Sequence, residues 1–230
     1  MPIVGPWRQP VATGTATVVC STRTDGDLHA DHVALPVLTA RWASITGRPT
    51  TWLDEVHGTD VVEVRRPGDG CGLTADAAVT LEPGAALGVW VGDCAPVVLV
   101  GQSGAVGAVH AGWKGLRDGV LEAAVIRLRE LGSGSLTGVV GPCIHAECYE
   151  FGDDDLAGIE AALGARVRST TSWGTTAPGR SSAVAAELGR LGVAHHDLAA
   201  PCTACDRDYW SHRARGDLGR HGVAVWVDAA

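Results

Sequence analysis

The chain has 230 residues, of which 46% are hydrophobic, and its formal net charge at pH 7 is −8. That much apolar material can bury a large core, and an acidic chain without a basic block argues against a nucleic-acid-binding protein. The N-terminus lacks a basic region followed by an apolar one, and Asp93 interrupts the longest apolar run (86–100), so we expect no signal peptide and no membrane span.

The first half of the chain is rich in short strand-like segments. They consist of valine, alanine, threonine and tryptophan and are separated by glycine, proline and aspartate, which is typical of β-structure. Strands are predicted at 16–23, 50–58, 60–66, 76–81, 86–94, 96–101 and 104–112. Between the first two, the segment 35–47 has apolar residues spaced by three and four, which predicts a helix that ends at Gly47.

Helical patterns alternate with strands in the second half. The helix predicted at 116–134 has Leu116, Val120 and Leu128 on one face and Gly132 as a cap. Helices are also predicted at 153–164 and 181–193, strands at 136–143 and 222–229, and a mobile loop at 170–180. This order indicates a single α+β domain over residues 1–230, with mixed sheets and no regular βαβ repeat.

Three residues at strand ends are candidates for a metal site: His57 in "EVHG", Cys94 in "GDCAP" and His110 in "VHAGW". Each lies beside a glycine or proline turn, where sites are commonly built on rigid scaffolds. Imidazole and thiolate suit Zn²⁺, and three protein ligands leave a fourth position open; Asp93 is a candidate acceptor for a ring N–H. The alternative is structural, with a buried thiol and histidines bonded to backbone carbonyls, because compact zinc spacing is absent.

The seven cysteines are interpreted as reduced thiols, because their number is odd and the chain is long for a disulfide scaffold. Cys143 and Cys148 lie in "GPCIHAECYE", and Cys202 and Cys205 form "CTAC". We interpret all four as buried or incidental thiols. A structural metal or a regulatory disulfide is the alternative for them.

An arginine-rich segment near the C-terminus, "RDYWSHRARGDLGR" (207–220), has two interpretations. Its arginines are suited to clamping a phosphate, and equally to a solvated surface with salt bridges. The chain contains no GxGxxG, GxxxxGK[ST] or GxSxG fingerprint, which argues against the standard dinucleotide, P-loop and serine-hydrolase sites.

Six motifs occur in an order that resembles the laccase-domain family. They are "WLDEVHGTDVV", "ADAAVT", "VGDCAPVVLV", "GAVHAGWKGLRDGVL", "GPCIHAECYEFG" and "CTACDRDYWSHR". That family was long described as multicopper polyphenol oxidases and has been reinterpreted as purine nucleoside phosphorylases with adenosine deaminase activity; one bacterial branch is named peptidoglycan editing factor. The resemblance implies an α+β fold of four layers, with two mixed β-sheets, flanking helices and two similar intertwined halves.

The resemblance also implies which residues form the site. The family's metal triad corresponds to His57, Cys94 and His110, with zinc as the expected metal, and these residues together with Asp93 form the expected catalytic set. The ligands are intact in this chain, so the resemblance predicts that metal binding is preserved.

Three further residues are expected to contact substrate. Arg23 matches a Thr-Arg pair of the family and is expected to contact phosphate or nucleoside, assisted by Lys114. Glu55 stands where the family usually has glutamine. A carboxylate there would change the local charge or act as a base.

The activity implied is phosphorolysis of adenosine, inosine or methylthioadenosine, accompanied by adenosine deamination. The expected partners are purine nucleosides and phosphate, without nucleic acid or membrane, for a cytoplasmic monomer or weak homo-oligomer. A peptidoglycan-precursor editing hydrolase would use the same Cys94 environment, and a non-catalytic binding protein is a further alternative. A copper phenol oxidase is disfavoured, because the chain has nine histidines, no HxH pair and only the initiator methionine.

Overall fold

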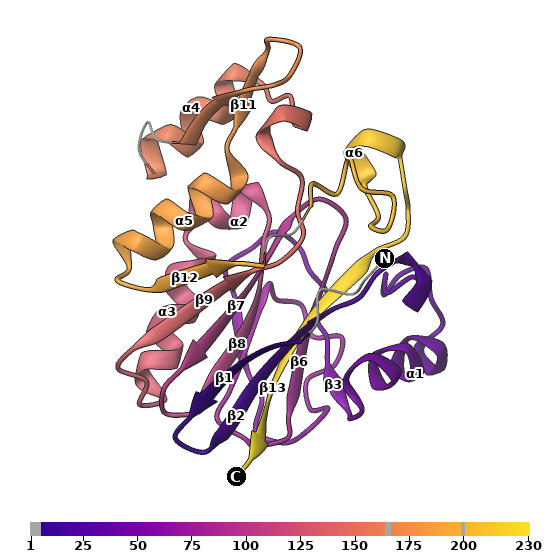
Figure 1. Ribbon diagram of the computed structural model, residues 1–230, viewed down its shortest axis with the longest axis vertical. Helices are drawn as coiled ribbons and strands as arrows, with labels where there is room; N and C mark the ends of the chain where they lie inside the picture. The colour runs from indigo at the N-terminus through magenta and orange to yellow at the C-terminus, as the bar shows by residue number, and fades with distance from the viewer. Residues whose placement is uncertain (1–5, 164–166, 199–200) are drawn as a thin grey trace.

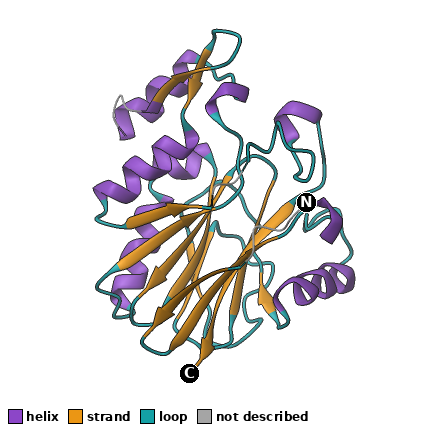
Figure 2. Cartoon of the chain, viewed as in Figure 1, coloured by secondary structure: helices purple, strands orange, loops and turns teal. Residues whose placement is uncertain are grey.

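The structure is a computed structural model that describes residues 6–163, 167–198 and 201–230. Within these residues, the strands form two large sheets and a two-stranded ribbon (Figures 1 and 2). Sheet I contains, in spatial order, β1 (Trp7–Val11), β2 (Gly14–Cys20), β13 (His221–Ala229), β6 (Ala86–Val91) and β3 (Thr50–Thr51). Sheet II contains β12 (Ala194–Asp197), β9 (Leu136–Val140), β7 (Ala95–Gly101), β8 (Val106–Ala111), β5 (Ala77–Thr80) and β4 (Val61–Glu63).

Both sheets are mixed. In sheet I, β13 pairs antiparallel with β2 and β6, while β3 pairs parallel with β6. In sheet II, β7 pairs antiparallel with β8 and β9, and the outer strands β12 and β4 pair parallel with their neighbours. The strand nearest the C-terminus therefore lies between strands of the first half of the chain, as the yellow β13 shows in Figure 1.

Helices lie on the outer faces of both sheets and beyond one end of them (Figure 1). They are η1 (Arg23–Asp25), α1 (Leu35–Thr46), α2 (Trp113–Asp118), α3 (Val120–Glu130), η2 (Ala146–Cys148), α4 (Asp153–Leu163), α5 (Arg180–Arg190) and α6 (His212–Arg215). In Figure 1, α3 and α5 lie beside sheet II, and α1 lies on the opposite side beside sheet I. No helix among the described residues is long and apolar enough to cross a bilayer.

The alternation of side chains along β7 shows how the layers are held together. Val97 and Leu99 pack into the core under α3 and α5, whereas Val98 and Val100 pack into the core between the sheets. A strand that is buried on both faces has a continuous apolar sequence, and β7 contains such a run, "PVVLV".

A further core lies between α1 and sheet I. Trp42 of α1 packs there against Trp90 and Ala224. Gly88 and Gly222 make room for its ring, because a Cβ at either position would lie 2.7 or 2.5 Å from Cη2 of Trp42. The order helices, sheet, sheet, helix agrees with the predicted α+β arrangement of four layers. The similarity of two halves stays a prediction.

Several predicted elements differ from the structure. The helix expected at 116–134 begins at Trp113 and is interrupted at Gly119, whose φ of 100° is left-handed and separates α2 from α3. The strand expected at 50–58 ends after two residues, and its remainder forms a loop. The expected loop at 170–180 contains part of a hairpin of β10 (Arg168–Thr170) and β11 (Thr176–Pro178).

Candidate active site and metal centre

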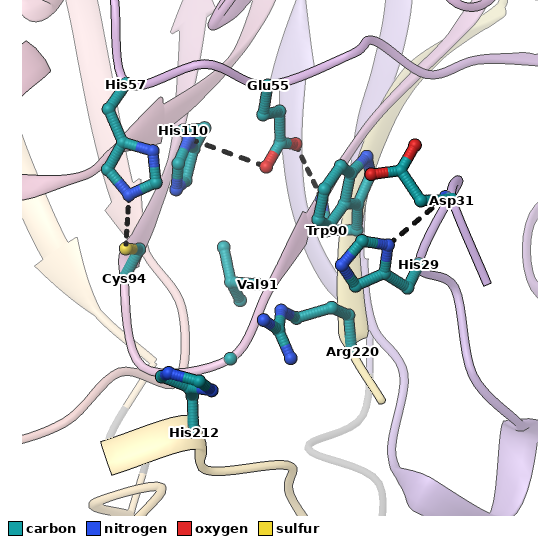
Figure 3. Close-up of a pocket in the computed structure, with 11 residues that line it drawn as sticks. His29, Asp31, Glu55, His57, Trp90, Val91, Cys94, His110, His212 and Arg220 are labelled. Atoms are coloured by element: carbon teal, nitrogen blue, oxygen red, sulfur yellow. Dashed lines mark hydrogen bonds and ion pairs between the residues drawn. The ribbon is translucent and has the colours of Figure 1, made fainter. Parts of the chain in front are cut away.

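Nitrogen and sulphur donors from distant parts of the chain meet at one end of the sheets. His57 follows β3, Cys94 lies in the turn between β6 and β7, and His110 is on β8. Their ligand atoms all lie within 4.8 Å of one another, and Nε2 of His57 is 3.7 Å from Sγ of Cys94. The two imidazole rings meet edge to face with centroids 4.7 Å apart (Figure 3). We call these three residues the His–Cys–His cluster.

A single buried carboxylate, that of Asp76, positions both histidines. His57 has a φ of 61°, a left-handed conformation that is costly for a residue with a side chain. The backbone N–H groups of Val56, His57 and Gly58 donate to Asp76 at 3.2, 2.8 and 2.6 Å and hold this conformation. Nδ1 of His110 lies 2.7 Å from Oδ1 of the same carboxylate. Asp76 therefore links the loop of His57 to the ring of His110.

A second buried carboxylate, that of Glu55, lies beside His110. Its Oε1 accepts a hydrogen bond from the backbone N–H of Trp90 at 2.9 Å, and its Oε2 lies 3.5 Å from Nδ1 of His110. Burial raises the pKa of Glu55 to about 8. Burial alone would lower the pKa of His110, but Glu55, Cys94 and the hydrogen bond with Asp76 raise it well above its ordinary value. The surroundings of the cluster therefore favour positive charge.

The donor set fits a divalent metal ion. Since a carboxylate can only accept, Nδ1 of His110 carries the proton shared with Asp76, and Nε2 is the ring atom suited to a metal. Two imidazoles and a thiolate are ligands that Zn²⁺ accepts, and three protein ligands leave a position for water or substrate. The carboxylate of Asp76, whose pKa is held below its usual range despite burial by its hydrogen bonds with His110, Gly58 and His57, adds negative charge that stabilises a cation.

The glycines of "HAGWKG" make room for the loop that carries His57. A Cβ on Gly112 would lie 2.5 Å from Cδ2 of His57, and a Cβ on Gly115 would lie 2.7 Å from the carbonyl oxygen of Gly58. Real side chains do not approach backbone or ring atoms so closely. The motif therefore allows the start of α2 to pack directly against the His57 loop.

Asp93 contacts two residues near the C-terminus. Its carboxylate accepts hydrogen bonds from Oγ1 of Thr203 and from the backbone N–H of Arg213, both at 2.7 Å. The expectation that Asp93 accepts the ring N–H of a site histidine is corrected for His110, whose Nδ1 faces Asp76 instead. Asp93 therefore connects the turn that carries Cys94 to residues 203 and 213, near the C-terminus.

A cavity of about 440 Å³ opens beside the His–Cys–His cluster, and we call it the central cavity. Figure 3 shows the cluster at one side of it, with His29, Trp90, His212 and Arg220 around the remainder. Its volume lies within the range of sites for small molecules. The cavity therefore combines metal-type donors, an aromatic ring and a cation.

Arg220 brings a guanidinium group to the central cavity. Among the described residues, its side-chain hydrogen bonds all come from Nη1, to the carbonyl oxygens of Asp217, Leu218 and Gly219 at 3.2, 2.8 and 2.9 Å. Gly92 leaves room for it, because a Cβ there would lie 2.9 Å from Cδ of Arg220. Figure 3 shows the guanidinium directed into the cavity, where it can bind an oxyanion.

The two cations that were expected to bind substrate lie elsewhere. Arg23 forms an ion pair with Asp217, and its guanidinium lies 4.0 Å from the ring centroid of Trp210. Lys114 is exposed on α2. Neither is among the described residues that line the central cavity, so the structure gives their predicted substrate contacts no support.

Asp76 was not assigned a role from the sequence, and Arg220 was only one of four arginines considered together as a phosphate clamp or a solvated surface. Asp76 lies in "ADAAVT", where an acid directly precedes an apolar strand. That unusual position is the feature of the sequence that could have marked Asp76 as a candidate site residue. Arg220 belongs to the arginine-rich segment, but nothing in the spacing of its arginines separates it from Arg207, Arg213 and Arg215.

Comparisons with known proteins agree with this architecture. The family model described as multi-copper polyphenol oxidoreductase laccase matches residues 25–228. The chain is 37% identical over 195 residues to a purine nucleoside phosphorylase of Streptomyces coelicolor, covering 83% of this chain and 80% of the relative. A Bacillus licheniformis protein, YfiH, has a TM-score of 0.81 at 22% identity over 93% of each chain. A Neisseria meningitidis protein of the DUF152 family has a TM-score of 0.79 at 23% identity, covering 97% of this chain and 99% of that one.

Proposed function

The chain belongs to the multi-copper polyphenol oxidoreductase laccase family, and we propose that it is a zinc-dependent purine nucleoside phosphorylase acting on adenosine, inosine and methylthioadenosine. The observation that supports this most is that Arg220 and the His–Cys–His cluster face the same cavity. Phosphorolysis needs a site for phosphate beside a site for the nucleoside, and the cavity offers both an oxyanion-binding group and an aromatic wall.

The residues of the cavity have distinct roles in this proposal. In phosphorolysis, a phosphate oxygen forms a bond to C1′ of the sugar while the bond from C1′ to the purine nitrogen breaks, and its electron pair leaves with the base. Arg220 would hold the phosphate and stabilise its charge as the bond forms. Trp90 forms a wall beside the nucleoside. Glu55, facing the cavity, is placed to exchange a proton with the substrate.

A metal would be held by the His–Cys–His cluster. When bound there, Zn²⁺ supplies a Lewis acid that polarises an oxygen of water or substrate. Asp76 fixes the ring of His110 and the loop of His57, so the orientation of both imidazoles is set by the protein.

The test is turnover of inosine with and without phosphate, using zinc-loaded protein. Hypoxanthine and ribose 1-phosphate should appear only when phosphate is present. The variant Arg220→Gln should raise KM for phosphate by about 10-fold or more, because a charge-assisted hydrogen bond is lost. Cys71→Ser is the control, since Cys71 is exposed and bonded to the carbonyl oxygens of Thr50 and Gly68 away from the cavity. Zinc-loaded protein that leaves every nucleoside unchanged would contradict the proposal.

Deamination of adenosine is a second candidate function, favoured by the position of Glu55. Its Oε2 is buried, accepts no hydrogen bond among the described residues, and lies 3.5 Å from Nδ1 of His110. Zinc deaminases use a glutamate beside the metal to move protons between water and the leaving amine. Glu55→Gln should lower ammonia release from adenosine by about 100-fold while inosine phosphorolysis falls less. Equal loss of both activities would assign Glu55 to the shared site rather than to deamination.

A further inference from the structure

A second group of metal-type donors lies outside the residues that line the central cavity. The Sγ atoms of Cys148, Cys202 and Cys205 all lie within 4.8 Å of one another, and those of Cys148 and Cys205 are 3.3 Å apart. We call these residues the three-cysteine cluster. Cys148 ends η2, and the other two lie in the turn that begins the C-terminal segment.

The backbone around the three-cysteine cluster turns its sulphur atoms toward one another. The N–H groups of Cys205 and Asp206 both donate to the carbonyl oxygen of Cys202, at 3.0 and 2.9 Å, so the "CTAC" segment is a tight turn. The N–H of His145 donates to Sγ of Cys202 at 3.2 Å. The thiolate is the form of cysteine that binds metals, and this N–H points at the sulphur atom that would be the ligand.

Positive charge and solvent access are present at the same place. Cys148 and Arg213 line a second cavity of about 470 Å³, and the guanidinium of Arg213 lies 4.5 Å from the ring centroid of Tyr149. Three deprotonated cysteines held this close together would repel one another, and a cation bound between them would remove that repulsion.

We propose that Cys148, Cys202 and Cys205 form a second metal site, which takes a thiophilic divalent ion such as Zn²⁺. Two cysteines in CxxC spacing joined by a third from a distant segment form the donor set of Cys₃ zinc sites. On binding, each S–H bond releases a proton to solvent as a metal–sulphur bond forms, so three protons leave and the complex carries one negative charge. Arg213 lines the same cavity as Cys148 and brings a positive charge to it, and the cavity would let water reach the fourth position.

The proposed ion has a structural consequence for the central cavity. It would tie η2 to the segment that carries Thr203 and Arg213, whose hydrogen bonds reach the carboxylate of Asp93. Asp93 immediately precedes the cysteine of the His–Cys–His cluster, and the same segment continues to Arg220. A metal bound at the three-cysteine cluster would therefore stabilise the segment that forms part of the wall of the central cavity.

The test is a titration of the full chain, reduced and stripped of metal, with Cd²⁺, whose bonds to thiolate absorb in the ultraviolet. The wild type should bind about two equivalents, one at each cluster. Cys205→Ser should lose one equivalent and most of the thiolate absorbance, whereas Cys94→Ala should lose one equivalent and keep most of it. Cys71→Ser, which also removes an exposed thiol, should match the wild type.

Three results would overturn the proposal. They are a wild-type protein that binds a single equivalent with the weak absorbance of one thiolate, a Cys205→Ser variant whose titration equals that of the wild type, and protein isolated without reductant in which Cys148 and Cys205 are joined by a disulfide and no metal is held. Mass measurement after alkylation distinguishes the disulfide. Cys148→Ser is the second variant, and circular dichroism of both serine variants establishes that any loss of metal is not a loss of fold.

Discussion

The His–Cys–His cluster and the three-cysteine cluster are built on different parts of the fold. The first lies where the ends of buried strands meet, beside carboxylates that are themselves buried. The second consists of sulphur alone and lies on short turns, with Cys205 exposed. Strand ends hold side chains rigidly and leave a cavity in front of them, which suits chemistry, whereas a thiolate site between two turns suits cross-linking of chain segments.

The strongest test of this difference is to remove one sulphur ligand from each cluster. Cys94→Ala should lower kcat/KM for phosphate-dependent hypoxanthine release by at least about 100-fold, because loss of a direct ligand should exceed the effect of losing an outer partner. Cys205→Ser should lower it far less and should lower the melting temperature instead. Equal losses of kcat/KM in the two variants would remove the distinction between a reactive and a structural cluster.

Asp76 tests whether the carboxylate behind the His–Cys–His cluster sets its geometry. Asp76→Asn keeps the size of the side chain but removes charge from an acceptor of three backbone N–H groups and one imidazole. Affinity for zinc should fall by about 10- to 100-fold, measured by competition with a chromophoric chelator. Asp60→Asn is the control, since Asp60 is exposed. An unchanged affinity would mean that strand packing alone positions the histidines.

Gly112 tests whether close packing of α2 holds the His57 loop. In Gly112→Ala, the added Cβ would meet Cδ2 of His57 at 2.5 Å, so the ring of His57 or the start of α2 must shift. Zinc affinity should fall by about 10-fold, at the low end of the range for changes outside the direct ligands. Gly134→Ala is a matched control, because a Cβ there meets no atom within 4 Å. Wild-type zinc affinity in Gly112→Ala would show that the loop can adjust.

The smallest effect at neutral pH is expected from replacing His221, a buried histidine that belongs to neither cluster; the quantity affected is the free energy of unfolding. Desolvation lowers its pKa from 6.5 to about 3. The buried imidazole stays neutral in the folded protein, whereas in the unfolded chain it takes up a proton below about pH 6.5. This group therefore leaves the free energy of unfolding unchanged above about pH 6.5 and lowers it as the pH falls toward 3, by up to about 1.4 kcal/mol per pH unit. Urea unfolding of wild type and His221→Phe should therefore show a weaker pH dependence between pH 6.5 and 4 in the variant. Equal slopes would contradict this.

Local patterns predicted the parts of the fold that depend on neighbouring residues. The helix that ends at Gly47 has a C-cap φ of 73°, the left-handed conformation for which glycine is chosen. The apolar run of β7 also read correctly as a buried strand. The continuous helix at 116–134 failed because its apolar pattern runs across Gly119, whose backbone breaks it.

The sequence predicted only part of the site, because local patterns do not show contacts between residues that are far apart in the chain. His57, Cys94 and His110 were singled out because they lie beside glycine or proline turns at strand ends. Asp76 was not, because its role depends on hydrogen bonds to residues 18 to 20 positions earlier and 34 positions later. Arg23 forms an ion pair with Asp217, far away in the sequence, and its contact with substrate stays a prediction.

The sequence by itself determined the α+β class, the metal-type donors and the family, because periodicity, residue chemistry and motif order are local properties of the chain. Only the tertiary structure decided which donors meet, which carboxylate orients them and which arginine faces the cavity. Those outcomes depend on β13 entering sheet I between β2 and β6, and on residues 148 and 202 coming together across the fold. Long-range strand pairing and burial set these distances, and no short stretch of sequence records them.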